Sequence, residues 1–204
     1  TQKGAKLSFA SHLTLSDFHD SFLSFGLTYS FLQFGIDTSQ NNSGQNVADL
    51  SNTSSNFDVG MLYRYERFSI SLNANNILNK KVDNLLTNEP ESTRRFTLYS
   101  SLVLVKIRNT IEIEPSVFIE YFEADRRSRT DMNIKVRKGI SDGYAWAGLS
   151  YTFLNDQFFT PNSIAPLVGL KKGNLYVSYG FSVNMNKTQD FNYGTHMITL
   201  GFDY

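Results

Sequence analysis

The sequence predicts an all-β protein, an antiparallel transmembrane β-barrel of the outer membrane. Three observations lead there. Apolar and polar residues alternate with a period of two, which only extended strands give. Many of these stretches are about ten residues long or longer, enough for a tilted strand to cross hydrocarbon. The chain also stops inside such a stretch, with an aromatic residue, Tyr204, at its end.

Alternation is strictest in four stretches, at 21–36, 68–75, 174–186 and 195–204. In 21–36 the two faces separate from Leu23 to Phe31. One face carries Leu23, Phe25, Leu27, Tyr29 and Phe31, and the other carries Ser24, Gly26, Thr28 and Ser30. Seven less regular stretches also favour strands, which brings the expected total to about eleven. They are 3–17, 57–65, 94–106, 110–123, 130–139, 143–154 and 163–170.

Short turns and longer polar loops separate these strands. The predicted turns are Asp17–Asp20, Arg108-Asn109, Ser141-Asp142-Gly143 and Lys171-Lys172-Gly173-Asn174, and the predicted loops are 38–56, 79–93 and 155–162. Short turns at one end and longer loops at the other are expected when one barrel end faces the periplasm and the other the exterior. No composition break divides the chain, so we expect a single barrel domain over 1–204.

Alternation alone does not say which face points inward. A soluble barrel would bury its apolar face, whereas a membrane barrel turns that face to lipid. The polar faces here are rich in Ser, Asn, Gly and Thr, with few of the Lys and Glu that coat soluble surfaces. Aromatic residues gather near strand ends, as expected of interfacial girdles. Examples are Tyr63, Tyr65, Phe158, Phe159, Phe202 and Tyr204. We therefore favour the membrane barrel over a soluble ligand-binding barrel.

The charges of the chain balance, with 19 basic and 19 acidic residues and a pI of about 6.8. This argues against nucleic acid as a partner, since such binding needs a basic patch. There is no cysteine, and the three histidines, His12, His19 and His196, show no metal-ligand spacing. We expect no enzyme activity, no cofactor, and no catalytic or metal residue. Ser8 and His12 share a polar face, so a catalytic group assembled from several strands stays open as an alternative.

The charged residues of two neighbouring strands are those expected of a water-filled barrel interior. Glu112, Glu114 and Glu120 share the polar face of 110–123, and Lys135 and Arg137 share that of 130–139. A hairpin through Asp125–Arg129 would place acids beside bases and allow cross-strand ion pairs. Arg64 and Glu66 similarly lie opposite Val59, Met61, Tyr63 and Tyr65. Such pairs either solvate and stiffen the interior or take part in transport or docking.

Five segments, in order along the chain, resemble the PorP/SprF family of outer-membrane proteins of the type IX secretion system of Bacteroidota. They are NFDVGMLYRYERFSISLNANNILNK at 56–80, EIEPSVFIEY at 112–121, YAWAGLSYTF at 144–153, IAPLVGLKKGNLYVSYGFSVNMN at 164–186 and GTHMITLGFDY at 194–204. The chain departs from the family pattern at Thr152, where the family has Arg, and at Met197, where it has Glu. The terminal segment also resembles the C-terminal assembly signal of outer-membrane barrels.

The resemblance implies a non-enzymatic role in secretion. Members of the family support the secretion or surface anchoring of cargo adhesins, which carry a C-terminal sorting domain, and they work with secretion or gliding components. Members also have further strands at the N-terminal side. Since eleven is an odd count, we expect two to four strands beyond this chain and about 14 in the closed barrel. A passive, porin-like channel is the alternative function. The expected partners are outer-membrane lipids, the cargo and the secretion machinery, and the sequence does not identify partner-binding residues.

Overall fold

The computed structural model describes residues 2–36, 50–78, 94–107, 111–124, 126–155, 160–186 and 193–203. Several sequence predictions lie outside these residues. They are the turn Arg108-Asn109, the loop 79–93, residues 38–49 of the first long loop, the aromatic pair Phe158-Phe159 and the terminal Tyr204. The described residues contain no helix that is long and apolar enough to cross a membrane.

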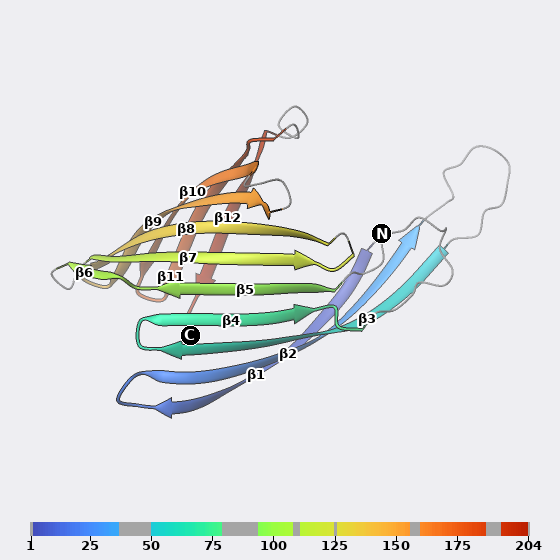
Figure 1. The fold of residues 1–204 in the computed structure, drawn as a ribbon, viewed down its shortest axis with the longest axis horizontal. Helices are drawn as coiled ribbons and strands as arrows, with labels where there is room; N and C mark the ends of the chain where they lie inside the picture. The colour runs from blue at the N-terminus through green and yellow to red at the C-terminus, as the bar shows by residue number, and fades with distance from the viewer. Residues whose placement is uncertain are drawn as a thin grey trace.

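The described residues form one antiparallel sheet (Figure 1). Its strands are β1 (Gln2–Ser16), β2 (Ser21–Ile36), β3 (Leu50–Tyr65), β4 (Phe68–Asn75), β5 (Arg95–Leu102), β6 (Val105–Ile107), β7 (Ile111–Phe122), β8 (Arg127–Ile140), β9 (Gly143–Leu154), β10 (Thr160–Lys172), β11 (Leu175–Asn184) and β12 (Gly194–Phe202). Strands next to each other in the sequence pair with each other, apart from β6, which continues β5 along the edge of β7. The sheet is a curved, open wall with β1 and β12 at its edges.

The strands β5 and β6 together are the one strand predicted over 94–106. Ser101 lies opposite Ser116 on β7, and Val105 lies opposite Ile113, so the register slips by one residue between them. Leu104 N–H donates to the Ile113 carbonyl across this irregularity, at 3.0 Å. Such a bulge bends a strand without ending its pairing. The prediction of about eleven antiparallel strands is therefore confirmed.

Two predicted loops are shorter than expected. Strand β3 begins at Leu50, which lies opposite Ile36, so residues 50–56 belong to a strand and not to the loop predicted over 38–56. Strand β10 begins at Thr160, inside the loop predicted over 155–162. The polar residues of 50–56 carry no strand signal of their own. They are extended because β2 offers them a row of backbone hydrogen-bonding groups.

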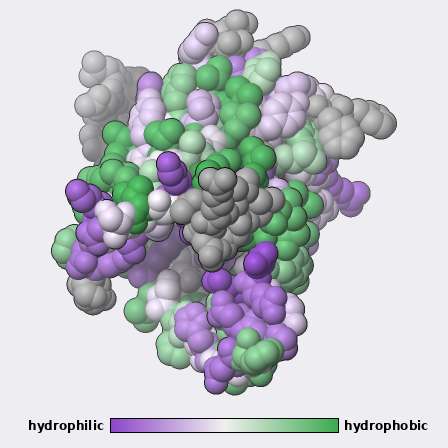
Figure 2. Space-filling model, turned by 90° about the vertical axis from the view of Figure 1, so that its left-hand side faces the viewer, coloured by the Kyte–Doolittle hydropathy of each residue, from purple (hydrophilic) through white to green (hydrophobic). Residues whose placement is uncertain are grey.

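The apolar faces point away from the concave side of the wall. Phe25 and Leu27 are 50% and 46% exposed, whereas Ser24 and Ser30, on the other face of the same strand, are only 8% and 5% exposed. Among the described residues only Phe153 and Ala165 are buried hydrophobic residues. A soluble barrel would show the opposite arrangement. The end-on view in Figure 2 shows green apolar and purple hydrophilic side chains together on the surface.

Candidate functional site on the inner face

The inner face of β7 and β8 carries three acid–base pairs in direct opposition. The strand register places Glu112 opposite Arg137, Glu114 opposite Lys135 and Glu120 opposite Arg129. All three are ion pairs. Lys135 Nζ lies 2.6 Å from Glu114 Oε2, Arg129 Nη2 lies 3.0 Å from Glu120 Oε2, and Arg137 contacts Glu112. The predicted cross-strand pairing is confirmed, although β8 already begins at Arg127, inside the hairpin loop predicted over Asp125–Arg129.

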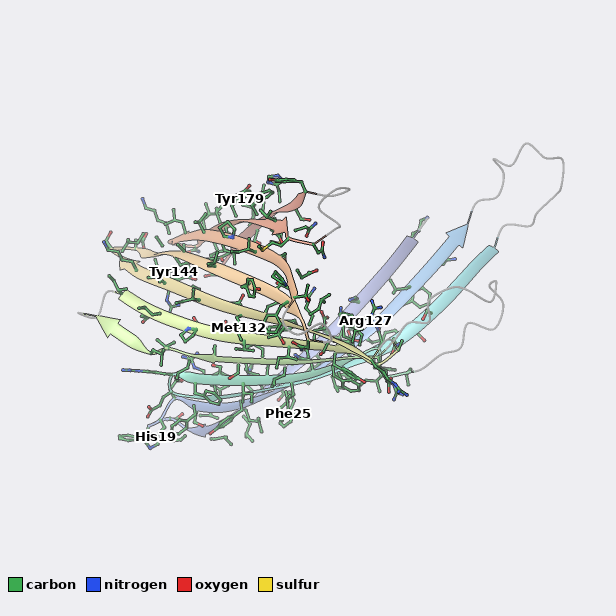
Figure 3. The ribbon with its side chains drawn as sticks, turned by 45° about the horizontal axis from the view of Figure 1, so that its top comes forward. His19, Phe25, Arg127, Met132, Tyr144 and Tyr179 are labelled. Carbon is green, nitrogen blue, oxygen red and sulfur yellow. The ribbon has the colours of Figure 1, made fainter. Side chains whose placement is uncertain are left out.

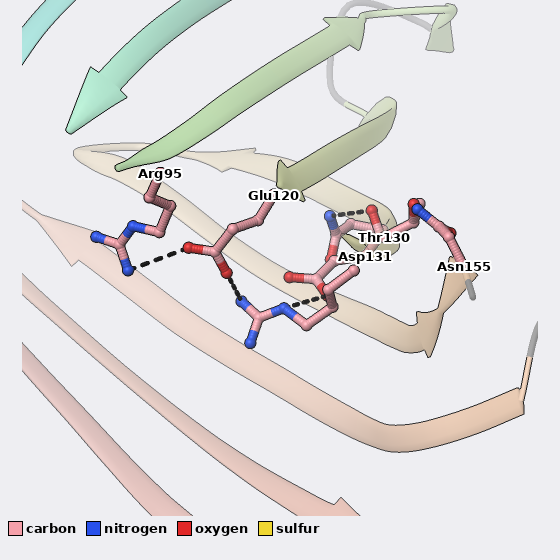
Figure 4. Close-up of polar contacts among 7 residues, drawn as sticks. Arg95, Glu120, Thr130, Asp131 and Asn155 are labelled. Carbon is pink, nitrogen blue, oxygen red and sulfur yellow. Dashed lines mark hydrogen bonds and ion pairs between the residues drawn. The ribbon is translucent and has the colours of Figure 1, made fainter. Parts of the chain in front are cut away.

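Glu120 is the most buried acid of this group, with a side chain only 6% exposed. It binds two guanidinium groups, Arg129 from β8 and Arg95 from β5, with the Arg95 Nη1 to Glu120 Oε1 distance at 3.1 Å (Figure 4). Arg129 Nε also lies 3.6 Å from Asp131 Oδ1. Two cations offset the cost of holding one carboxylate away from water. The sequence analysis did not find Arg95, because its partner is diagonal across a strand pair and not opposite.

These contacts continue along the β7–β8 hairpin towards both of its ends. Arg94 Nε donates to Glu123 Oε2 at 2.5 Å beyond one end of the strands, and the Tyr99 hydroxyl lies 3.5 Å from Glu114 Oε1 nearer the other. We call the pairs on Glu112, Glu114 and Glu120 the ion-pair ladder. The ladder keeps the inner face polar while it ties β5, β7 and β8 together.

A second charged group joins two neighbouring short turns. His19 Nδ1 lies 3.0 Å from Glu66 Oε1, and Arg64 Nη2 lies 3.3 Å from Asp20 Oδ2. The Glu66 N–H also donates to the His19 carbonyl, at 3.2 Å. The β1–β2 turn is thereby fastened to the β3–β4 turn, at the opposite end of the sheet from Arg127 (Figure 3). The side chains of the predicted polar residues Arg64 and Glu66 pair with Asp20 and His19 of the other turn, and Arg64 Nε also donates to the Glu66 carbonyl at 3.3 Å.

The other two histidines have separate partners. His12 Nδ1 lies 2.7 Å from Ser24 Oγ on the inner face, and Ser8 instead contacts Thr28. His196 Nδ1 lies 2.8 Å from the Tyr179 hydroxyl on the outer face of β11 and β12. The structure thus places Ser8 and His12 on one face, as predicted, but gives each a different partner on β2. Within the described ranges no three His, Asp or Glu side chains are grouped to hold a metal ion.

The inner face of β9 to β12 is built differently, from large side chains lying over glycines. Trp146 lies opposite Gly169, and a Cβ on that glycine would come within 2.8 Å of Trp146 Cζ2. A Cβ on Gly180 would come within 2.5 Å of Leu167 Cδ2 and 3.3 Å of Met197 Cε. Glycine in a strand often marks such a close approach. The sequence patterns did not predict this packing role for Gly169 or Gly180, because it depends on which residue lies opposite each glycine.

The comparison with family models finds one match that spans almost the whole chain. The model described as "Type IX secretion system membrane protein PorP/SprF" matches residues 1–202. A search of curated proteins gave no match. The family match agrees with the all-β sheet and with its exposed apolar face, which are the properties of an outer-membrane barrel.

Proposed function

The chain belongs to the PorP/SprF family of type IX secretion membrane proteins, and from this membership we propose that it supports secretion or surface anchoring of a cargo adhesin. The family match over residues 1–202 carries the proposal. As a component of this system the protein is located in the outer membrane. Its role there is structural: the barrel holds its place in the lipid while its inner face or its loops contact cargo and machinery.

The two faces of the sheet support this proposal, since one suits contact with lipid and the other suits contact with protein. The apolar outer face suits contact with membrane lipids, since the hydrocarbon region accepts side chains such as Phe25 and Leu27. The inner face offers charges of both signs, which suits polar contact with a protein segment better than it suits selection of one kind of ion. We further propose that the protein has no enzymatic activity and that its partners are a cargo with a C-terminal sorting domain and secretion or gliding components.

Closure of the barrel follows from strand direction. Eleven strands lie along the path of the sheet from β1 to β12, so the two edge strands run in the same direction. In lipid, unpaired edge groups are costly, and a barrel in which every neighbour is antiparallel needs an even strand count. We infer that an odd number of further strands lies between β1 and β12 in the closed barrel. We propose that residues 1–204 are part of one barrel domain with about 14 strands in all.

A passive channel is the second candidate function, favoured by the hydrated ion-pair ladder on the inner face. A barrel of about 14 strands has room for a water-filled lumen unless loops or a plug fill it. Ion conductance of the purified protein in planar bilayers would support the channel. A protein that does not conduct, yet binds a secreted surface protein, would support the anchor.

Isolation from native membranes tests the proposed function. The intact protein, carrying an affinity tag, would be extracted in mild detergent and its companions identified by mass spectrometry. We expect a secretion component or a surface adhesin with a sorting domain. The matched control is an unrelated outer-membrane barrel carrying the same tag. Recovery of the same porin-like neighbours with both proteins, and of no secretion component or adhesin, would contradict the proposal.

A further inference from the structure

A small polar cavity lies on the inner face near the end of the sheet that has the short turns. Its volume is about 260 Å³. Strands β3, β4, β5 and β8 and the turns beside them contribute its basic and hydroxyl groups, and none of the sequence predictions included it. Those groups are Arg64, Arg67, Ser69, Ser101, Lys135 and Arg137. The acids on its lining are Glu66 and Glu114.

The acceptors in this cavity are already occupied. Glu114 accepts from Lys135 at 2.6 Å and from the Tyr99 hydroxyl at 3.5 Å, and Glu66 is held by His19. Among the cations, Arg64 is paired with Asp20 and Arg137 with Glu112. Each guanidinium has five N–H donors and each ammonium three, so these pairs leave donors unused.

Arg67 is the cation of this group with no ion-pair partner within the described parts of the chain. It lies in the β3–β4 turn, and its carbonyl accepts from Val103 N–H at 3.0 Å, which fixes the turn against the end of β5. Ser101 also lines the cavity and is only 7% exposed, and no hydrogen bond of its hydroxyl is seen within the described residues. The cavity therefore has spare donors and one cation, Arg67, without an ion-pair partner, while its two carboxylates are already paired with Lys135 and His19.

We propose that this cavity binds an oxyanion, a phosphate or carboxylate group, held by Arg67 and the Ser101 hydroxyl with help from Lys135. Guanidinium groups match the two oxygens of a carboxylate or phosphate, and such charge-assisted hydrogen bonds are the strong ones. The volume is sufficient for one such group. Short turns mark the periplasmic end of these barrels, so the ligand enters from the periplasm. The proposal depends on the fold and not on the proposed role in secretion.

Calorimetric titration of the purified full chain in detergent tests this site. The probes are inorganic phosphate and acetate. The buffer contains no anion other than chloride. We expect binding that weakens as the salt concentration rises. Arg67→Gln should weaken binding about tenfold or more, and Ser101→Ala by about threefold to tenfold, since each removes donors to the anion.

Lys138→Gln is the matched control, because it removes the same charge near the same end of the sheet but outside the cavity. Its affinity should stay within about twofold of the original protein, as expected for a charge screened by solvent. Tighter binding of phosphate than of acetate would identify a phosphoryl group as the natural ligand, and the reverse order would identify a carboxylate. The proposal is overturned if neither probe binds, or if Arg67→Gln and Lys138→Gln weaken binding equally.

Discussion

Two parts of the inner face hold their neighbouring strands together with different chemistry. On β5, β7 and β8 the ion-pair ladder places full charges opposite one another, whereas on β9 to β12 large side chains lie over glycines. Both parts share the same outer face, with Ile134 on β8 and Leu149 on β9 49% and 42% exposed. The outer face is constrained by lipid. The inner face is free to vary as long as its polar groups find partners or water.

The two parts differ in what holds neighbouring strands together. In the ladder, attraction acts between side chains in opposite positions, and water around the arginines weakens it. Over the glycines, contact depends on the missing Cβ, so shape complementarity is decisive. The first part should therefore respond to charge and salt, and the second to volume.

The largest expected effect concerns the outer face that both parts share. Ile134 and Leu149 lie opposite each other, as do their inner-face neighbours Asn133 and Ser150. Arginine at Ile134 or at Leu149 should lower the free energy of unfolding in lipid by about 2–4 kcal/mol, because it places a charge in hydrocarbon. Urea unfolding in lipid vesicles measures the change.

Arginine at Asn133 or Ser150 is the matched control, because these residues lie at the same depth but on the inner face. Its cost should stay below about 1 kcal/mol, because the guanidinium remains hydrated. Equal costs on the two faces would mean that the faces are not divided between lipid and water, and the comparison would fail.

The next effect tests the ladder at its most buried acid. Glu120→Ala leaves Arg95 and Arg129 without their shared carboxylate. Loss of one partner of a fully buried pair costs about 3–5 kcal/mol. Since the two arginine side chains are 44% and 38% exposed and can be hydrated, we expect a smaller loss, about 2–3 kcal/mol, in the same unfolding assay.

Glu123→Ala provides the comparison for this change, since Glu123 pairs with Arg94 but is 40% exposed. Its cost should be below about 1 kcal/mol, as for other exposed ion pairs. If both alanine variants lose the same stability, burial does not set the strength of the ladder.

A substitution that adds side-chain volume tests the packing over glycines on β9 to β12. Gly169→Ala places a methyl group against Trp146 and should cost about 1–3 kcal/mol of unfolding free energy through overpacking. Trp146 is the only tryptophan in the chain, so its fluorescence reports any displacement of the ring directly.

Two further variants test whether the cost of Gly169→Ala comes from crowding against Trp146 or from placing alanine at any glycine of the sheet. A Cβ on Gly26 would meet its nearest atom, the Phe9 carbonyl oxygen, at 4.0 Å, so Gly26→Ala should be nearly neutral. Replacing Trp146 with the smaller Phe should remove most of the penalty of Gly169→Ala. A penalty unchanged by Trp146→Phe would show that the ring does not occupy this space.

The smallest effect distinguishes the two parts by salt. A double-mutant cycle on Glu114 and Lys135 should give a coupling energy of about 0.5–1 kcal/mol at low ionic strength, falling as salt is added. A cycle on Trp146 and Gly169 should give a coupling that salt leaves unchanged. Similar salt dependence in both cycles would remove the distinction between the two parts.

The sequence alone determined the features that depend on local alternation. The strand positions, the division into an apolar and a polar face, and the opposition of Glu112, Glu114 and Glu120 to basic residues all follow from a side-chain period of two and one short hairpin. The sequence also predicted that the apolar face contacts lipid, and that face is exposed in the structure. The family resemblance likewise came from the sequence, and the family match agrees with it.

Only the tertiary structure decided which distant residues meet. Arg95 reaches Glu120, Arg64 reaches Asp20, and β3 extends back to Leu50 along β2. Each of these depends on the register between strands and on the bends at their turns, and local alternation fixes neither. Register comes from the pairing of whole strands. That is why one short hairpin was enough to predict the ladder pairs, whereas the contact of Arg95 with Glu120 and the packing of Trp146 over Gly169 depended on the register of the sheet.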